Sequence, residues 1–205
     1  MDYLEPFRDV DLTVTISELL VATAESSDPL LDNTVSELLH AMRQRMAMDV
    51  VFVSEFVDGR RMFRYVDAAP GAPAIEPGDS NPAEESVCQR VVEGRVPELV
   101  RHLSAMPSDD MPPLAFPIGA HLSTPIVMKD KRVYGTLCCF SAAPRPELVQ
   151  ADLDRLRMCA ALVARKIDLN EARGVKEPPP DWQLLPLDEY QSPAWQQGSR
   201  RKHAG

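Results

Sequence analysis

Four cysteines and four histidines are the side chains of this 205-residue sequence best suited to redox, metal or nucleophilic chemistry. No two cysteines have the CxxC spacing that is typical of metal sites and redox motifs. In the reducing compartment expected for this chain, we predict free thiols rather than disulfides. Spacing alone therefore predicts no metal site. The four cysteines are Cys88, Cys138, Cys139 and Cys159.

Two of these cysteines are adjacent, within the strand-like run RVYGTLCCFS at 132–141. Successive residues of a strand point to opposite faces, so a regular strand cannot turn Cys138 and Cys139 toward one pocket or one metal ion. A free cysteine also behaves as a small, buried hydrophobic residue. We predict core packing for this pair. A thiol facing a ligand cavity, and redox or metal chemistry, are the alternatives.

Cys88 lies in a predicted short helix, 86–94, close after Glu84 and Glu85. Neighbouring carboxylates raise the pKa of a thiol rather than lower it, which disfavours an activated nucleophile. We predict that Cys88 packs in the core, with a ligand-facing or redox-sensing role as the alternative.

The histidines and the short motifs do not indicate an enzyme. His40 and His203 are expected to be solvated, whereas His102 and His121 flank a long predicted loop and are expected to have ordinary surface or hydrogen-bonded roles. The sequence contains no HExxH, no GxSxG, no Walker loop and no dinucleotide fingerprint. We therefore predict a protein without enzymatic activity.

The composition is that of an ordinary globular protein, with 44% hydrophobic and 26% charged residues and a net charge of −9. An acidic surface repels phosphate backbones and anionic lipid, so we expect neither nucleic acid nor a membrane as a partner. No apolar run is long enough to span a membrane. The N-terminus has early acids and no basic segment, so we expect no secretory signal and a cytoplasmic location.

The order of helix-like and strand-like segments predicts the fold class. Asp28-Pro29 is a helix start signal, and the apolar spacing after it predicts a helix to about Met46. Asp58-Gly59 predicts a hairpin turn. The other predicted elements are strands 49–57 and 61–69, helix 86–94, a short strand near 97–103, strands 121–128 and 132–141, and helix 150–173. Hairpin-linked strands with terminal helices indicate an α+β fold, an antiparallel sheet covered by helices.

Two long, proline-punctuated loops, 70–82 and 104–120, interrupt this pattern. Long loops inside one compact domain commonly enclose a ligand. We divide the chain into an N-terminal extension with a short helix (1–27), one domain (28–173) and a C-terminal tail (174–205). The tail contains both tryptophans, so we expect it to dock on a protein surface.

The last predicted hairpin carries the most informative motifs. Thr124-Pro125-Ile126 ends one strand, Val133-Tyr134-Gly135-Thr136-Leu137 opens the next, and a proline-bearing break and a closing helix follow. With these motifs, the segment 28–173 resembles a GAF domain, the small-molecule sensor module of many bacterial signalling proteins. Two further stretches look like the first hairpin and the pocket helix of that family, DVVFVSEFVDGRRMFRYVD and ESVCQRVVEGRVPEL. The resemblance implies an antiparallel sheet flanked by N- and C-terminal helices, with a PAS/GAF-type ligand pocket. It also implies close packing of another segment at Gly135.

Strand alternation and this resemblance together select a ligand side of the sheet. The residues expected to bind ligand are His121, Ser123 and Pro125 on one strand, Thr136, Cys138 and Phe140 on the next, and Cys88 and Val91 on the short helix. A surplus apolar stripe on helix 150–173 fits the helical dimer interface common in such sensors, unless both stripes pack within one protomer. The residues expected at that interface are Leu153, Leu156, Ala160, Val163 and Ile167.

Specialised branches of the family differ from this sequence. The bilin-binding type has a cysteine beside a histidine, whereas FPIGAHLS has His121 and no cysteine, so we expect no covalent pigment. The cyclic-nucleotide signature is absent. The branch that reduces free methionine sulfoxide places cysteines between the middle strands, and the loop 104–120 has none. A haem-binding sensor with His102 or His121 as axial ligand stays an alternative.

These observations predict a non-enzymatic signalling module that binds a small molecule or senses redox state, with no cofactor identified. The signal would pass through a helical homodimer to a separate, unidentified partner protein. One alternative is a thiol-based reductase with Cys88 and either Cys138 or Cys139 as the redox pair. Another is a pure interaction protein that binds its partner through the tail.

Overall fold

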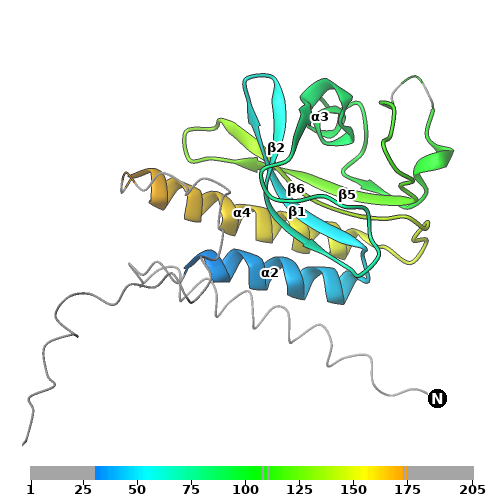
Figure 1. The fold of residues 1–205 in the computed structure, drawn as a ribbon, viewed down its shortest axis with the longest axis horizontal. Helices are drawn as coiled ribbons and strands as arrows, with labels where there is room; N and C mark the ends of the chain where they lie inside the picture. Colours follow the sequence, from blue (N-terminus) through cyan, green and yellow to red (C-terminus); the bar gives the residue numbers. More distant parts are fainter. Residues whose placement is uncertain (1–30, 108, 110, 173, 175–205) are drawn as a thin grey trace, which may run out of the picture.

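One six-stranded antiparallel sheet forms the centre of the computed structural model, which describes residues 31–107, 109, 111–172 and 174 (Figure 1). The strands lie in the order β3-β2-β1-β6-β5-β4, so β1 and β6 form the middle of the sheet. Their bounds are β1 Val50–Val57, β2 Arg60–Ala68, β3 Ser80–Pro82, β4 Leu99–Val100, β5 Ala120–Val127 and β6 Val133–Ser141. Every neighbouring pair is antiparallel, and the predicted α+β class is confirmed.

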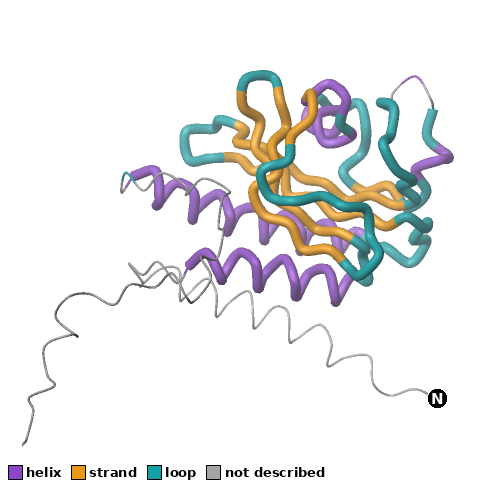
Figure 2. The backbone as a smooth tube through the Cα atoms, viewed as in Figure 1, coloured by secondary structure: helices purple, strands orange, loops and turns teal. Residues whose placement is uncertain are grey.

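Helices and loops divide the two faces of the sheet between them. Figure 2 shows the two long helices, α2 (Leu31–Met46) and α4 (Gln150–Ala172), side by side on one face. The short helix α3 (Val87–Val92) and the long loops lie on the other face. Two 3₁₀ turns lie near α3: Ala83–Glu85 precedes it in the chain, and Leu103 of Leu103–Ala105 packs against Val87 and Val91.

The hairpin turns form where the sequence predicts them. Asp58 and Gly59 have φ angles of 49° and 72°, the left-handed conformations of a two-residue type I′ turn. The short edge strand β3 was not predicted from the sequence. It lies at the end of the predicted loop 70–82 and pairs with the start of β2. Three residues that end in proline give no strand pattern, so only the pairing reveals this strand.

The helix side of the sheet holds the larger part of the hydrophobic core. Val35, Leu38 and Met42 of α2 are at most 4% exposed, so the apolar spacing that predicted this helix marks its buried face. They pack together with residues of β5, β6 and α4, among them Leu122, Cys139 and Leu156. We refer to this group as the helix-side core.

The stripe of α4 that was assigned to a dimer interface lies in this core instead. None of its five side chains is more than 6% exposed, and Leu156 is fully buried. The five residues are Leu153, Leu156, Ala160, Val163 and Ile167. Cys159 of the same helix is buried in this core as well. These side chains have no free surface to offer a second copy, and their assignment to an interface is corrected.

Gly135 in the middle strand β6 is approached closely by β1. A Cβ atom placed on Gly135 would lie 1.9 Å from the carbonyl oxygen of Ser54, well inside van der Waals contact. The close packing that the resemblance implied at this position is confirmed. Glycine is therefore required for the central β1–β6 pairing to form with its observed register.

Parts of the predicted organisation lie outside the described residues. The N-terminal extension 1–27 and the tail 174–205, apart from Gly174, are among them. Among the helices that the structure describes, none combines the length and the apolar character needed to cross a membrane.

Candidate functional site

The candidate site lies on the sheet face opposite α2 and α4. A compact group of buried residues covers the middle of this face, and we call it the cavity-side cluster. Its members are Val50, Phe52, Phe63, Cys88, Cys138 and Phe140. Antiparallel pairing explains the grouping, because Phe52 lies directly opposite Cys138, and Val50 opposite Phe140. Directly opposed residues of paired strands share one face of a sheet.

A cavity of about 360 Å³ opens between this cluster and the long loops. Four phenylalanines line it, and contacts between their rings connect its walls. Phe52 and Phe63 meet edge to face with ring centroids 4.9 Å apart. The rings of Phe116 and Phe140 stack 5.2 Å apart, which brings the loop 104–120 onto the sheet. A cavity of this size and aromatic lining can hold a small organic molecule.

One arginine gives this apolar cavity a positive, hydrogen-bonding side. The guanidinium of Arg61 lies 4.6 Å from the centre of the Phe63 ring, a cation–π contact. Its Nε donates to the side-chain oxygen of Asn81 at 3.1 Å, and its Nη1 lies 3.3 Å from the sulfur of Cys88. Asp79 and Glu85 also line the cavity. The guanidinium is thus held in place beside both the cavity and a thiol.

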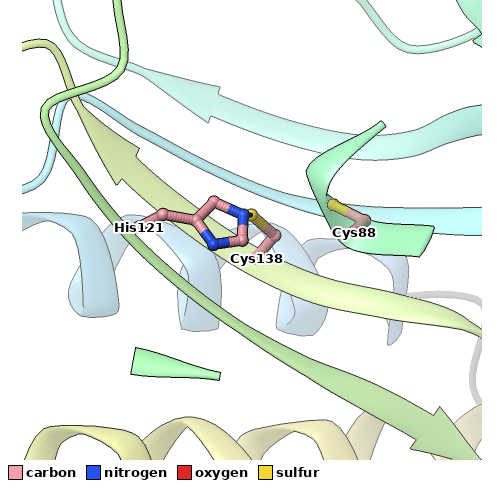
Figure 3. Close-up of side chains that lie close together, drawn as sticks. All are labelled: Cys88, His121 and Cys138. Carbon is pink, nitrogen blue, oxygen red and sulfur yellow. Dashed lines mark hydrogen bonds between the residues drawn. The ribbon is translucent and has the colours of Figure 1, made fainter. Parts of the chain in front are cut away.

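Two thiols and an imidazole converge beside the cavity, and we call them the thiol–imidazole cluster (Figure 3). Cys88 comes from α3, His121 from β5 and Cys138 from β6. One side-chain ligand atom from each lies within 4.8 Å of the other two, and the His121 Nε2 to Cys138 Sγ distance is 3.1 Å. Each residue is only 1% exposed. Such a group can bind a metal ion, form a disulfide or move a proton.

The two thiols of the cluster differ in their pKa. A hydrogen bond from Cys138, with the nearby charges of Arg61 and His121, holds the pKa of Cys88 well below its usual value despite burial. Burial and the neighbouring Cys88 raise the pKa of Cys138 well above its usual value. The sequence-based prediction of a raised pKa at Cys88 is wrong. Glu84 and Glu85 are exposed, while the helix turns Cys88 inward toward its partners.

The structure brings together some of the predicted ligand residues. His121, Cys138 and Phe140 line the cavity. Cys88 does not line it, but it belongs with His121 and Cys138 to the thiol–imidazole cluster. The alternation predicted for Cys138 and Cys139 is confirmed, since Cys139 lies in the helix-side core.

Four other predicted residues lie away from the cavity wall. Val91 packs in a separate apolar group with residues such as Val96 and Leu103. Thr136 is fully buried, and its hydroxyl lies 3.0 Å from that of Ser54. Two further predicted residues, Ser123 and Pro125, share the face of β5 with His121 but do not line the cavity.

The two histidines considered as haem ligands have different surroundings. His121 is buried and lines the cavity, whereas His102 is exposed and its Nδ1 contacts Ser104 Oγ at 3.2 Å. Only His121 of this pair faces the cavity.

Sequence reasoning missed Arg61, Phe52 and Phe63. The signal that would have found Phe52 is the central pairing of β1 with β6, which sets it opposite Cys138. Alternation along β2 alone would not have found Arg61 and Phe63, because a register shift separates them from Val66, the residue opposite Phe52. The missing step was the pairing of strands that are distant in the sequence, which no local pattern states.

Both the sequence and the fold of this chain are similar to those of known proteins. A family model described as GAF domain matches residues 29–168. Among curated proteins, none matches the sequence. Many solved structures share the fold, and those described below have identities too low to indicate more than the fold.

Three solved structures illustrate the range. The GAF domain of an Acinetobacter phosphoenolpyruvate-protein phosphotransferase aligns over 84% of this chain and 97% of its own, with 16% identity and a TM-score of 0.62. The phycocyanobilin-bound GAF domain of a cyanobacterial phytochrome aligns over 79% and 96%, with 14% identity and a TM-score of 0.60. Free methionine-R-sulfoxide reductase of Neisseria meningitidis, in complex with its substrate, aligns over 79% and 91%, with 13% identity and a TM-score of 0.60. With a family model matched over most of its length and this fold, the chain belongs to the GAF domain family.

Proposed function

We propose that this chain is a non-catalytic sensory module that binds a small molecule in the cavity between its sheet and its loops. The observation that carries the proposal is the cavity of about 360 Å³ itself, with four phenylalanines and one arginine on its walls. We further propose that the protein acts in the cytoplasm, as a homodimer, and that a separate protein receives the signal.

The lining selects a class of ligand. Aromatic walls favour a flat, mainly apolar molecule, because flat faces stack on phenylalanine rings. Arg61, already oriented by Asn81, favours a negative or hydrogen-bond-accepting group on that molecule. The ligand class is therefore a planar, mainly apolar compound with one anionic or acceptor end.

The central strand offers a route from the cavity to the helices. On β6, Cys138 and Phe140 face the cavity, while Leu137 and Cys139 pack in the helix-side core with α4. A ligand that displaces one face of β6 therefore moves side chains that contact α4. The proposal requires two states of the protein with different affinities for the ligand.

The experiment that tests the proposal uses the dye 1-anilinonaphthalene-8-sulfonate, which combines flat rings with one anionic group. We expect saturable binding of one dye per chain to the folded protein. Arg61→Gln should weaken binding about tenfold by removing a charge-assisted contact. Arg64→Gln is the matched control, since Arg64 lies on the same strand and pairs with Glu55 instead of lining the cavity. The proposal would be refuted if the dye does not bind saturably, or if Arg61→Gln and Arg64→Gln weaken dye binding equally.

A second candidate function is supported by the position of Cys88 beside Cys138. Two thiols at this distance can reduce a sulfoxide to a sulfide, with release of water and formation of a disulfide between them. The test is reduction of free methionine sulfoxide with dithiothreitol as the final reductant. Turnover that is lost in Cys88→Ser but kept in Cys139→Ser would establish a reductase. Absence of turnover, or equal turnover in both variants, rules it out.

A further inference from the structure

The thiol–imidazole cluster combines donor atoms from three separate elements at one buried point. Cys88, His121 and Cys138 are distant in the sequence, so no motif announces them. Figure 3 shows the sulfur of Cys88 directed toward the other two side chains. Thiolate sulfur and imidazole nitrogen are the donors that Zn²⁺ prefers in proteins.

The spacing of these donors is close to that of a tetrahedral zinc site. With Zn–S bonds of about 2.3 Å and Zn–N bonds of about 2.0 Å, neighbouring ligand atoms lie about 3.5–3.8 Å apart. Here one donor atom from each residue lies within 4.8 Å of the other two, and Nε2 of His121 is 3.1 Å from Sγ of Cys138. Shifts of about 1 Å or less bring all three within bonding distance of one ion.

His121 lacks the hydrogen bonds that usually compensate a buried imidazole. The residue is 1% exposed, and its Nδ1 has no hydrogen-bond partner among the described residues. Its Nε2 lies 3.1 Å from the sulfur of Cys138, a weak hydrogen-bond group. A buried polar group with so little compensation destabilises the fold unless something else satisfies it. Ligation of a metal by Nε2 would give that nitrogen a strong partner in place of a weak one, while Nδ1 would still lack a partner among the described residues.

We propose that Cys88, His121 and Cys138 form a Zn²⁺ site whose fourth coordination position faces the cavity. Two thiolates neutralise the charge of the ion, which suits an apolar surrounding. The N–H of Arg61 Nη1, 3.3 Å from the sulfur of Cys88, stabilises that thiolate as an outer contact. His121 and Cys138 line the cavity, so the open position is accessible to water or to a donor atom of a ligand. The site goes beyond the proposed ligand cavity and exists whether or not an organic molecule binds.

The test begins with the full chain, reduced and free of any affinity tag. Its zinc content is measured by inductively coupled plasma mass spectrometry, and its affinity for Zn²⁺ is measured by competition with a chromophoric chelator. We expect one Zn²⁺ per chain. Substitution by Co²⁺ should give the sulfur-to-cobalt charge-transfer absorption and the intense visible bands of a tetrahedral site with thiolate ligands.

Variants at neighbouring cysteines of one strand provide a matched comparison. Cys138→Ser should weaken zinc affinity by about 100-fold or more, because loss of a ligand exceeds the effect of losing an outer contact. Cys139→Ser removes an equally buried thiol that lies on the opposite face, and should change the affinity less than threefold. If Cys138→Ser does not fold, the cobalt spectrum of the unaltered protein and the zinc affinity of His121→Gln still test whether the site exists.

Each outcome bears on the proposal. The site is established if one Zn²⁺ binds per chain and if zinc affinity falls only in variants of Cys88, His121 and Cys138. Absence of stoichiometric binding by the reduced protein overturns it, and so does an equal loss in Cys138→Ser and Cys139→Ser. If Cys88 and Cys138 form a disulfide, the protein is reduced and zinc binding is measured again. A reduced chain that still does not bind Zn²⁺ overturns the proposal and favours thiol redox chemistry at this cluster.

Discussion

Cys138 and Cys139 are adjacent in β6 but belong to two different hydrophobic clusters on opposite faces of the sheet. Cys138 lies with Phe52 and Phe140 beside the cavity, and its sulfur contacts His121. Cys139 packs under the helices with Leu122 and with Cys159 of α4. One strand therefore separates a thiol with polar partners from a thiol surrounded by the core.

The thiols of the helix-side core should be unreactive in the folded protein. Burial raises the pKa of Cys159 to about 12 and that of Cys139 higher still. The thiolate is the reactive form, and at pH 8 a thiol with a pKa of about 12 is ionised in about one molecule in ten thousand. We expect N-ethylmaleimide to label Cys139 and Cys159 only as the protein unfolds, measured by peptide mass spectrometry across a urea series.

A reactive control can be placed on the same helix. Ala161 of α4 is exposed, so Ala161→Cys should be labelled at once in the native state. Labelling of Cys159 at a comparable rate without urea would show that α4 opens locally, and would contradict the packing described here.

The sequence could predict the elements better than the site. Asp58-Gly59 and the apolar periodicity are local signals, and they predicted a hairpin and helices that the structure confirms. The predicted helix start at Asp28-Pro29 lies outside the described residues. The approach of Cys88 to Cys138 depends on where α3 lies over β6, which is set by packing between distant segments. The α4 stripe shows the same limit, because periodicity identifies an apolar face without stating whether the sheet or a second copy covers it.

Gly135→Ala should destabilise the fold markedly, because the new Cβ would lie 1.9 Å from the carbonyl oxygen of Ser54. The two central strands can only separate or shift to make room, and overpacking of this kind costs about 1–3 kcal/mol or more. Urea unfolding followed by circular dichroism measures the change. Gly59→Ala is the comparison, since that position has open space and a φ of +72°, and costs about 1 kcal/mol from backbone conformation alone. A smaller effect at Gly135 than at Gly59 would contradict the close β1–β6 contact.

The ion pair between Arg43 of α2 and Asp67 of β2 should contribute more to stability than the exposed pairs. The Arg43 side chain is only 10% exposed, so Asp67→Ala leaves a mainly buried guanidinium without its acceptor. We expect a loss of about 2 kcal/mol in the free energy of unfolding.

The exposed pair of Arg132 with Glu171 provides the control for this measurement. Both side chains are about half exposed, so Glu171→Ala should change stability by less than about 0.5 kcal/mol. Both variants are compared by urea unfolding at the same ionic strength. An equal effect of the two substitutions would show that the α2–β2 contact is not protected from solvent.

Thr136→Val should lower stability without affecting the cavity. The hydroxyl of Thr136 lies 3.0 Å from that of Ser54, and both residues are fully buried. Valine keeps the shape but leaves Ser54 only the long contact to the carbonyl of residue 136, at 3.5 Å, and an uncompensated buried hydroxyl costs about 1–3 kcal/mol. Thr136→Ser keeps the hydroxyl and should retain most of the stability. Dye binding should match that of the unaltered protein in both variants, because Thr136 does not line the cavity. Weakened binding in Thr136→Val, on the scale expected for Arg61→Gln, would place Thr136 in the ligand site after all, as strand alternation and the family resemblance together had predicted.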